Sequence, residues 1–239
     1  MHSKSSFGRL VWLLERVFIQ LQGKLPIEVF NVTLMQPIMC ETIPSGETWV
    51  YEVKYDGFRC VLTWTNDSVQ LTSRNGTDLS GKFPEIIDAC RSEQSHVQSY
   101  LPLELDGELA ILNHTYQANF ALIQKRSRLQ DTEKINEQAA AHPASFMVFD
   151  LLASAGSSRQ GQPFAQRKHE LALVFGNTNQ LGERLQYIAC TTDAHALWQT
   201  LVTSKGEGLV AKQRDSLYQP GKNIMIGLKS KIGEPLRHF

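Results

Sequence analysis

Charged side chains gather at the end of one strand-like stretch, WVYEVKYDGFRC, at residues 49–60. Apolar and charged residues alternate through it, which predicts a strand with one face in water. Lys54 and Arg59 enclose an aspartate and a glycine in the run KYDGFR. A lysine amine is a nucleophile when it is deprotonated, and burial or neighbouring cations favour the deprotonated form. Lys54 is therefore the first candidate for covalent chemistry.

Four other stretches also place charged residues beside a predicted strand. With the first, the set is EVKYDGFR (52–59), ELDGEL (104–109), FMVFDLL (146–152), EGLVAK (207–212) and GLKSK (227–231). One such stretch carries little information, but five indicate a shared cleft. Glycines follow aspartates in YDG and LDG, where the missing Cβ allows a turn or the close approach of a ligand. Alternation puts Lys229 and Lys231 on one side of a strand, as it does Glu52 and Lys54.

These stretches must be positioned by strands and helices that alternate irregularly along the chain. Strands are predicted over residues 50–64, 69–72, 103–112, 146–152, 208–212 and 224–231. Helices are predicted over residues 83–91, 118–124, 166–174 and 194–205. This order of elements predicts an α+β fold.

The 239 residues, 42% of them hydrophobic, suffice for one large domain or two small ones. An apolar run near the N-terminus is interrupted by Glu15 and Arg16, which predicts an amphipathic helix rather than a signal peptide. We expect a helical N-terminal extension at residues 1–30 and one domain at residues 31–239.

The formal net charge is zero, so no global field draws the chain to nucleic acid or to an anionic membrane. Any such binding must come from local clusters, of which the basic stretch 204–239 is the candidate. The cysteines are far apart and form no C-x-x-C pair, which argues against a zinc site or a disulfide framework. No apolar run reaches the ~20 residues of a membrane span. We expect a reducing, cytoplasmic compartment and no membrane partner.

The five charged stretches, in this order and at this spacing, resemble the nucleotidyltransferase motifs of ATP-dependent DNA ligases, most closely the bacterial end-joining and repair type. KYDGFR is similar to the family's lysine motif K-x-D-G-x-R, and SRNG (73–76) to the arginine-bearing motif after it. FALIQKR (120–126) is similar to the family's F-x-x-L-Q-x-R. The resemblance spans residues 34–231 and implies an ATP-grasp-like nucleotidyltransferase fold, with antiparallel sheets flanked by helices.

The resemblance implies adenylyl transfer through a lysyl-AMP intermediate. Lys54 would attack the α-phosphate of ATP, form a phosphoramidate and expel pyrophosphate. Arg59 and Glu108 would hold the ribose hydroxyls, since a guanidinium donates and a carboxylate accepts hydrogen bonds. Phe149 would stack on the adenine, and Glu52 would accept a hydrogen bond from its amino group.

The resemblance also assigns residues to the metal, the phosphates and DNA. Glu207 would bind Mg²⁺ or Mn²⁺, because Mg²⁺ on a triphosphate uses one or two carboxylates. Lys229 and Lys231 would contact the α-phosphate and stabilise its charge during transfer. Arg74 would lie near the 5′-phosphate to be sealed. Taken alone, Arg74 also fits a solvent-exposed loop and Phe149 a core position.

The sequence departs from the family pattern in two places. Gly227 stands ahead of the last lysine pair, where the family often has an aromatic residue. Family ligases continue into an OB-fold domain, but only IGEPLRHF follows that pair, which is too short for a five-stranded barrel. We therefore expect no OB-fold domain here, in either a natural single-domain protein or a fragment.

The expected substrates are ATP and nicked double-stranded DNA, and the expected further partner is a separate DNA-binding or repair protein. Two alternatives stay open. One is an RNA ligase or an RNA-capping nucleotidyltransferase, which shares the lysine chemistry. The other is a non-catalytic nucleic-acid-binding module that kept the fold. A covalent nucleotide adduct on Lys54 would separate the enzymes from the module.

Overall fold

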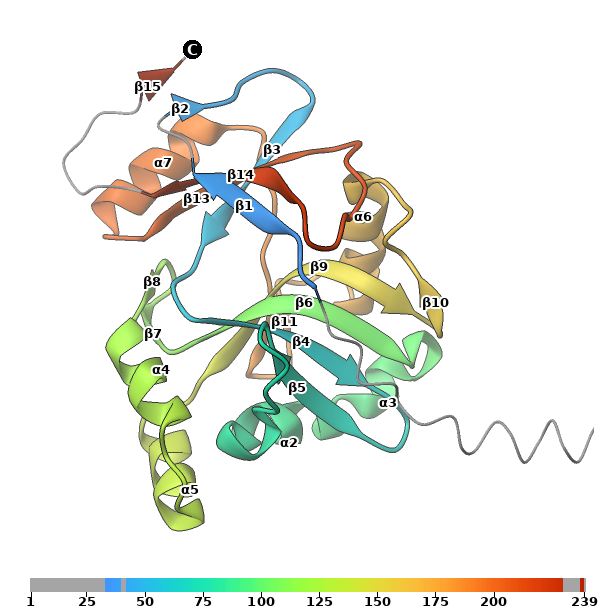
Figure 1. Ribbon diagram of the computed structural model, residues 1–239, viewed down its shortest axis with the longest axis vertical. Helices are drawn as coiled ribbons and strands as arrows, with labels where there is room; N and C mark the ends of the chain where they lie inside the picture. Colours follow the sequence, from blue (N-terminus) through green and yellow to red (C-terminus); the bar gives the residue numbers. More distant parts are fainter. Residues whose placement is uncertain (1–32, 40–41, 230–236, 239) are drawn as a thin grey trace, which may run out of the picture. The chain divides into compact units, whose positions relative to one another are not determined.

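Two sheets contain most of the strands in the computed structural model of the protein (Figure 1). The structure describes residues 33–39, 42–229 and 237–238, with the strand at 223–229 described by its backbone. The predicted helix within residues 1–30 and the candidate Lys231 lie outside these residues. The described residues belong to one compact unit that begins at Val32.

The larger sheet has the strand order β11-β12-β9-β6-β4-β5, and β10 pairs with β9. Its pairs are antiparallel except for β12 with β9, which is parallel. Alternate residues of β4 (Cys60, Leu62 and Trp64) face a core in which they are fully buried. The strands are β4 (Phe58–Trp64), β5 (Val69–Ser73), β6 (Leu103–Ala110), β9 (Ser145–Ser154), β10 (Ser157–Ser158), β11 (Gln180–Leu181) and β12 (Leu185–Tyr187).

The smaller sheet has the order β1-β14-β13-β3, and β1 runs parallel to β14. The expected antiparallel sheets therefore each contain one parallel pair. Two further strand pairs are short. These strands are β1 (Gln36–Met39), β3 (Trp49–Lys54), β13 (Gly208–Gln213) and β14 (Asn223–Lys229), with the short pairs β2 (Thr42–Ile43) with β15 (Arg237–His238) and β7 (Leu112–His114) with β8 (Gln117–Ala118).

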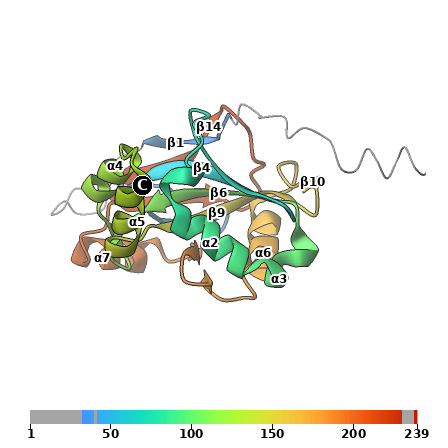
Figure 2. The ribbon, with the colours of Figure 1, turned by 90° about the horizontal axis from the view of Figure 1, so that it is seen from below.

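Helices cover one face of the larger sheet, and β1 and β14 lie on its other side (Figure 2). Helix α7 packs on the smaller sheet through Trp198 and Leu201, which contact Tyr51 and Leu209 in an apolar cluster. The helices are α2 (Pro84–Ser92), α3 (Gln94–Val97), α4 (Phe120–Ser127), α5 (Thr132–Ala141), α6 (Phe164–Val174) and α7 (Ala194–Thr203), with 3-10 turns η1 (Ser80–Lys82) and η2 (Gln98–Tyr100). Among the described residues, no helix has the length and apolar character that a membrane span requires.

The α+β class is confirmed, and four helices lie on the predicted ranges. The pattern does not predict α5, because Ile135 is its one buried residue and gives no apolar stripe. The single strand predicted over residues 50–64 is wrong. The chain leaves one sheet after Lys54 and enters the other at Phe58, so the same stretch provides β3 and β4 to different sheets.

Candidate functional site

Residues 55–57 connect the two sheets and place Lys54 where the chain crosses between them. Lys54 is the last residue of β3, and Phe58 is the first of β4. Gly57 is required here, because a Cβ at this position would lie 2.0 Å from the carbonyl oxygen of Leu109. The Phe58 ring packs on Phe120 of α4, with ring centroids 5.9 Å apart. The crossover thus holds the end of β3 against the larger sheet.

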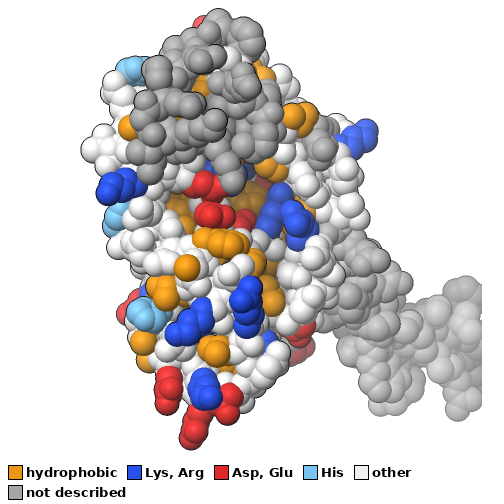
Figure 3. Space-filling model, turned by 60° about the vertical axis from the view of Figure 1, so that its left-hand side comes forward, with side chains coloured by type: hydrophobic (Ala, Val, Ile, Leu, Met, Phe, Trp, Pro, Cys, Tyr) orange, Lys and Arg blue, Asp and Glu red, His pale blue; other side chains and the backbone are white. Residues whose placement is uncertain are grey.

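A cavity of about 560 Å³ lies at this crossover. Its walls come from β1, β3, β4, β6, β9, β13, the end of α4 and the turn after β5. Figure 3 shows acidic and basic side chains gathered in a hollow on this face. The predicted site residues that line the cavity are Glu52, Lys54, Arg59, Arg74, Glu108 and Phe149.

The Lys54 amine forms an ion pair with the carboxylate of Glu207. The two side chains are 20% and 15% exposed, so both are within reach of a ligand. The sequence predicts cationic neighbours for this amine, whereas its neighbour among the described side chains is the Glu207 carboxylate. Strand register places Gly208 opposite Lys54 on one side and opposite Lys229 on the other. The backbone of Lys229 therefore lies two strands from Lys54.

Arg59 is held by Asp106 and lies against Phe149. Its Nε and Nη2 donate to the two carboxylate oxygens of Asp106 at 3.0 and 2.7 Å. Its guanidinium carbon lies 5.1 Å from the centre of the Phe149 ring. Register pairs Arg59 with Glu108, and Asp106 lies two residues before Glu108 on β6. The side chains of Arg59, Asp106 and Glu108 therefore lie on one face of the sheet. Asp106 is completely buried, whereas Phe149 is half-buried at the cavity wall.

Burial raises the pKa of Glu108 to about 8, although Arg59 and Lys54 act to lower it. The folded protein therefore keeps a proton on this carboxyl over a pH range in which the unfolded chain has lost it. At neutral pH the neutral carboxyl can donate a hydrogen bond as well as accept one.

This shift predicts a pH-dependent stability. Because the folded-state pKa is raised, the contribution of Glu108 is complete below its ordinary value near 4.5 and is lost as the pH rises through about 8. Urea unfolding from about pH 5 to pH 9 should show that wild type loses stability relative to Glu108→Gln across this range. The exposed Glu137→Gln serves as the control and should run parallel to wild type. Parallel curves for Glu108→Gln and wild type would contradict the assignment.

Glu52 is 1% exposed and lies between two buried lysines. Its Oε1 contacts Lys168 Nζ of α6 at 2.5 Å, and its Oε2 contacts Lys212 Nζ of β13 at 2.6 Å. The Cys190 thiol donates to the same Oε1, at 3.2 Å. Burial alone would raise the pKa of Glu52, but the two lysines lower it below its ordinary value. The carboxylate is therefore ionised and fixed in place.

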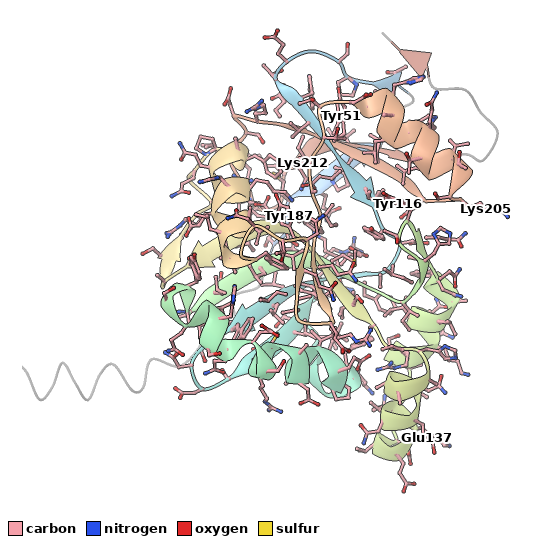
Figure 4. All side chains as sticks on the ribbon, turned by 180° about the vertical axis from the view of Figure 1, so that it is seen from behind. Tyr51, Tyr116, Glu137, Tyr187, Lys205 and Lys212 are labelled. Atoms are coloured by element: carbon pink, nitrogen blue, oxygen red, sulfur yellow. The ribbon has the colours of Figure 1, made fainter. Side chains whose placement is uncertain are left out.

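The two lysines also contact aromatic rings. Lys212 Nζ lies 4.8 Å from the centre of the Phe149 ring, and Lys168 Nζ lies 4.4 Å from that of Tyr187. Lys212 and Tyr187 can be followed in the stick view (Figure 4). Lys212 lines the cavity together with Phe149, so a cation and an aromatic ring form one wall.

Sequence reasoning assigned no role to four residues that hold the site. Asp106 and Lys212 stand inside the charged stretches LDGEL and EGLVAK, so their position was a signal. Lys168 and Tyr218 lie in a helix and a loop with no motif around them. Tertiary contacts alone bring Lys168 to the carboxylate of Glu52 and Tyr218 to that of Asp106.

Within the described ranges, no group of three or more His, Cys, Asp or Glu side chains comes together to hold a metal ion. An all-protein metal cage is therefore not built from these residues. Single carboxylates such as Glu207 suit Mg²⁺ instead, because that ion takes most of its ligands from water and phosphate oxygens.

Comparisons with known proteins agree on one family. The model of the ATP dependent DNA ligase domain matches residues 35–231. The bifunctional non-homologous end joining protein LigD of Bacillus subtilis is 37% identical over 204 residues, which are 82% of this chain and 33% of that protein. DNA ligase C1 of Mycolicibacterium smegmatis is 34% identical over 212 residues, which are 86% of this chain and 58% of that one. The chain thus spans about a third to somewhat over half of these relatives.

A solved structure shows the same fold. It is that of a mycobacterial DNA ligase D complexed with ATP and MES, with a TM-score of 0.62 and 24% identity. The match covers 84% of this chain and 61% of that one.

Proposed function

The chain belongs to the ATP-dependent DNA ligase domain family, and from this premise we propose that it transfers AMP from ATP to the 5′-phosphate of nicked duplex DNA through a lysyl-AMP. The observation that carries the proposal is the cavity, where Lys54, Arg59 and Phe149 meet from three strands of two sheets. The name of the Bacillus subtilis relative supports a role in end-joining repair.

Lys54 is the nucleophile of the proposed reaction. Its Nζ attacks the α-phosphorus of ATP, a P–N bond forms, and the bond to the oxygen that bridges the α- and β-phosphates breaks. Pyrophosphate leaves with the bonding electrons, and the amine loses its proton, for which the Glu207 carboxylate is the nearest described acceptor. An oxygen of the DNA 5′-phosphate then attacks the same phosphorus, a P–O bond forms and the P–N bond breaks, and the nitrogen takes up a proton and leaves as the amine of Lys54.

The cavity wall supplies contacts for the nucleoside. Phe149 stacks on the adenine, and Arg59 with Glu108 holds the ribose hydroxyls. Glu52 accepts from the adenine amino group through Oε2. Each carboxylate oxygen accepts about two hydrogen bonds. Lys168 and Cys190 use both sites of Oε1, whereas Lys212 uses one site of Oε2. Oε2 is therefore the oxygen that can accept the further hydrogen bond from the adenine.

The remaining residues serve the phosphates and DNA. Glu207 would hold Mg²⁺ or Mn²⁺ together with triphosphate oxygens, and a bound ion neutralises phosphate charge. By the resemblance, Lys229 and Lys231 would contact the α-phosphate; the Lys229 side chain and the whole of Lys231 lie outside the described residues. Arg74 is exposed at the cavity rim, where a DNA phosphate can reach it.

Intact mass after incubation with ATP and Mg²⁺ tests the proposal. We expect the gain of one AMP, no comparable gain with GTP, and discharge of the AMP by nicked duplex DNA. RNA strands added as competitors should not discharge it. An unchanged mass would favour the non-catalytic module, and labelling by GTP would favour a capping-type enzyme.

Phe149→Ala should weaken ATP binding by about 1–3 kcal/mol, because the stacking surface is lost. Phe149→Tyr should lose less, since it keeps the ring. Calorimetric titration with ATP in the absence of a divalent ion would measure both affinities. Equal affinity in wild type and both variants would place Phe149 in the core and outside the site.

A further inference from the structure

Tyr218 contacts the residue that holds Arg59, although it lies in a loop far along the chain. Its hydroxyl donates to Asp106 Oδ2 at 2.7 Å, and this oxygen also accepts from Arg59 at 2.7 Å. The same hydroxyl accepts from the backbone N–H of Met35 at 3.3 Å. Tyr218 is 4% exposed, so water does not compete for these bonds. The phenol is therefore fixed on both sides.

The ring of Tyr218 is also held. It lies 5.7 Å from the guanidinium of Arg167, which forms a buried ion pair with Asp150. The backbone N–H of Tyr218 donates to the carbonyl of Gln160 at 3.0 Å. Burial and the nearby Asp106 raise the pKa of Tyr218 well above its usual range, so the hydroxyl stays a donor. Tyr218 thus has one orientation, with its O–H directed at Asp106.

Asp106 needs such a partner because its carboxylate is fully buried. Arg59 donates to both oxygens, which fixes the guanidinium in one plane over Phe149. A guanidinium carries five donors, and this pair uses two of them. The remaining donors act on a ligand only in the orientation that Asp106 sets. Asp106 in turn depends on the Tyr218 hydroxyl.

We propose that Tyr218 is a positioning residue for Arg59, which acts through Asp106 to orient the guanidinium toward the ribose of the bound nucleotide. This inference rests on the proposed function. It also connects two parts of the site, because Tyr218 lies in the loop between β13, which carries Lys212, and β14, which carries Lys229.

The test compares Tyr218→Phe with wild type for binding of ATP and of 2′,3′-dideoxy-ATP, by calorimetry without a divalent ion so that no transfer occurs. We expect the variant to lose about tenfold in ATP affinity, the size of one hydrogen bond to a charged group, and to lose little for the dideoxy nucleotide. The ratio of the affinity for ATP to the affinity for 2′,3′-dideoxy-ATP should therefore fall by about the same factor in the variant. Tyr51→Phe is the matched control, because its buried hydroxyl donates to the carbonyl of Pro44 instead.

Unchanged ATP affinity in Tyr218→Phe would overturn the inference, and so would equal losses for both nucleotides, which indicate a general structural role. Wild-type protein is tested in parallel for the covalent AMP adduct. If wild type forms the adduct and Tyr218→Phe keeps the full preference for ATP, the inference alone fails. If wild type neither binds ATP nor forms the adduct, the proposed function fails and the inference with it.

Discussion

Lys54→Ala should abolish covalent AMP transfer while the protein remains folded. In the proposed mechanism the amine of Lys54 forms the bond to the α-phosphorus, and alanine offers no nucleophile in its place. The side chain is 20% exposed at the end of β3, so its loss leaves no large cavity in the core. Intact mass with ATP and Mg²⁺ measures the adduct, and a thermal melt measures the fold.

Lys125→Ala is the matched control for this experiment. Lys125 is exposed on α4 and does not line the cavity, so this variant should acquire AMP as wild type does. An acid-labile AMP adduct on the Lys54→Ala protein would show that another residue is the nucleophile. If Lys54→Ala melts at a temperature well below that of wild type, Lys54→Arg replaces it in the test. Arginine keeps the positive charge beside Glu207 and should also fail to form the adduct.

Arg126→Met should destabilise the protein by about 3–5 kcal/mol, because it leaves the Glu85 carboxylate, which is only 11% exposed, without its cation. Arg126 is 1% exposed and forms an ion pair with Glu85 of α2 at 3.0 Å. It also donates to the carbonyl oxygens of Lys82 and His142, at 2.9 and 3.2 Å. One side chain therefore connects α4 with α2 and with the residues that lead into β9. Urea unfolding measures the loss.

Two further variants make this result specific. Arg91→Met removes an ion pair with Asp88 whose side chains are about 70% exposed, and it should change stability by less than about 0.5 kcal/mol. Glu85→Gln combined with Arg126→Met should recover part of the loss, because no buried charge is then unpaired. If Arg126→Met is as stable as Arg91→Met, the buried pair contributes little and α4 is held by its apolar contacts alone.

The local elements of this protein follow from the sequence. Apolar periodicity predicts α2, α4, α6 and α7, because a helix face repeats within a few residues. The order of the charged stretches indicates a ligase-type nucleotidyltransferase, and the family match confirms it. The same stretches predict one cleft, and the cavity is lined by six of the seven predicted site residues whose side chains the structure describes. The apolar periodicity and the charged stretches each extend over only a few neighbouring residues. They can therefore be recognised without knowledge of the tertiary contacts.

Long-range packing decided what the sequence did not. The pattern of residues 49–60 is the same for one long strand as for two strands in different sheets, and the close contact of Gly57 with the backbone of Leu109 belongs to the folded structure. Glu52 is predicted as a base contact, but its two cations, Lys168 and Lys212, lie more than a hundred residues away. The partner of the Lys54 amine is likewise decided by the pairing of β3 with β13, which brings Glu207 beside it. Charge partners are chosen by distance in space, and a single sequence records only distance along the chain.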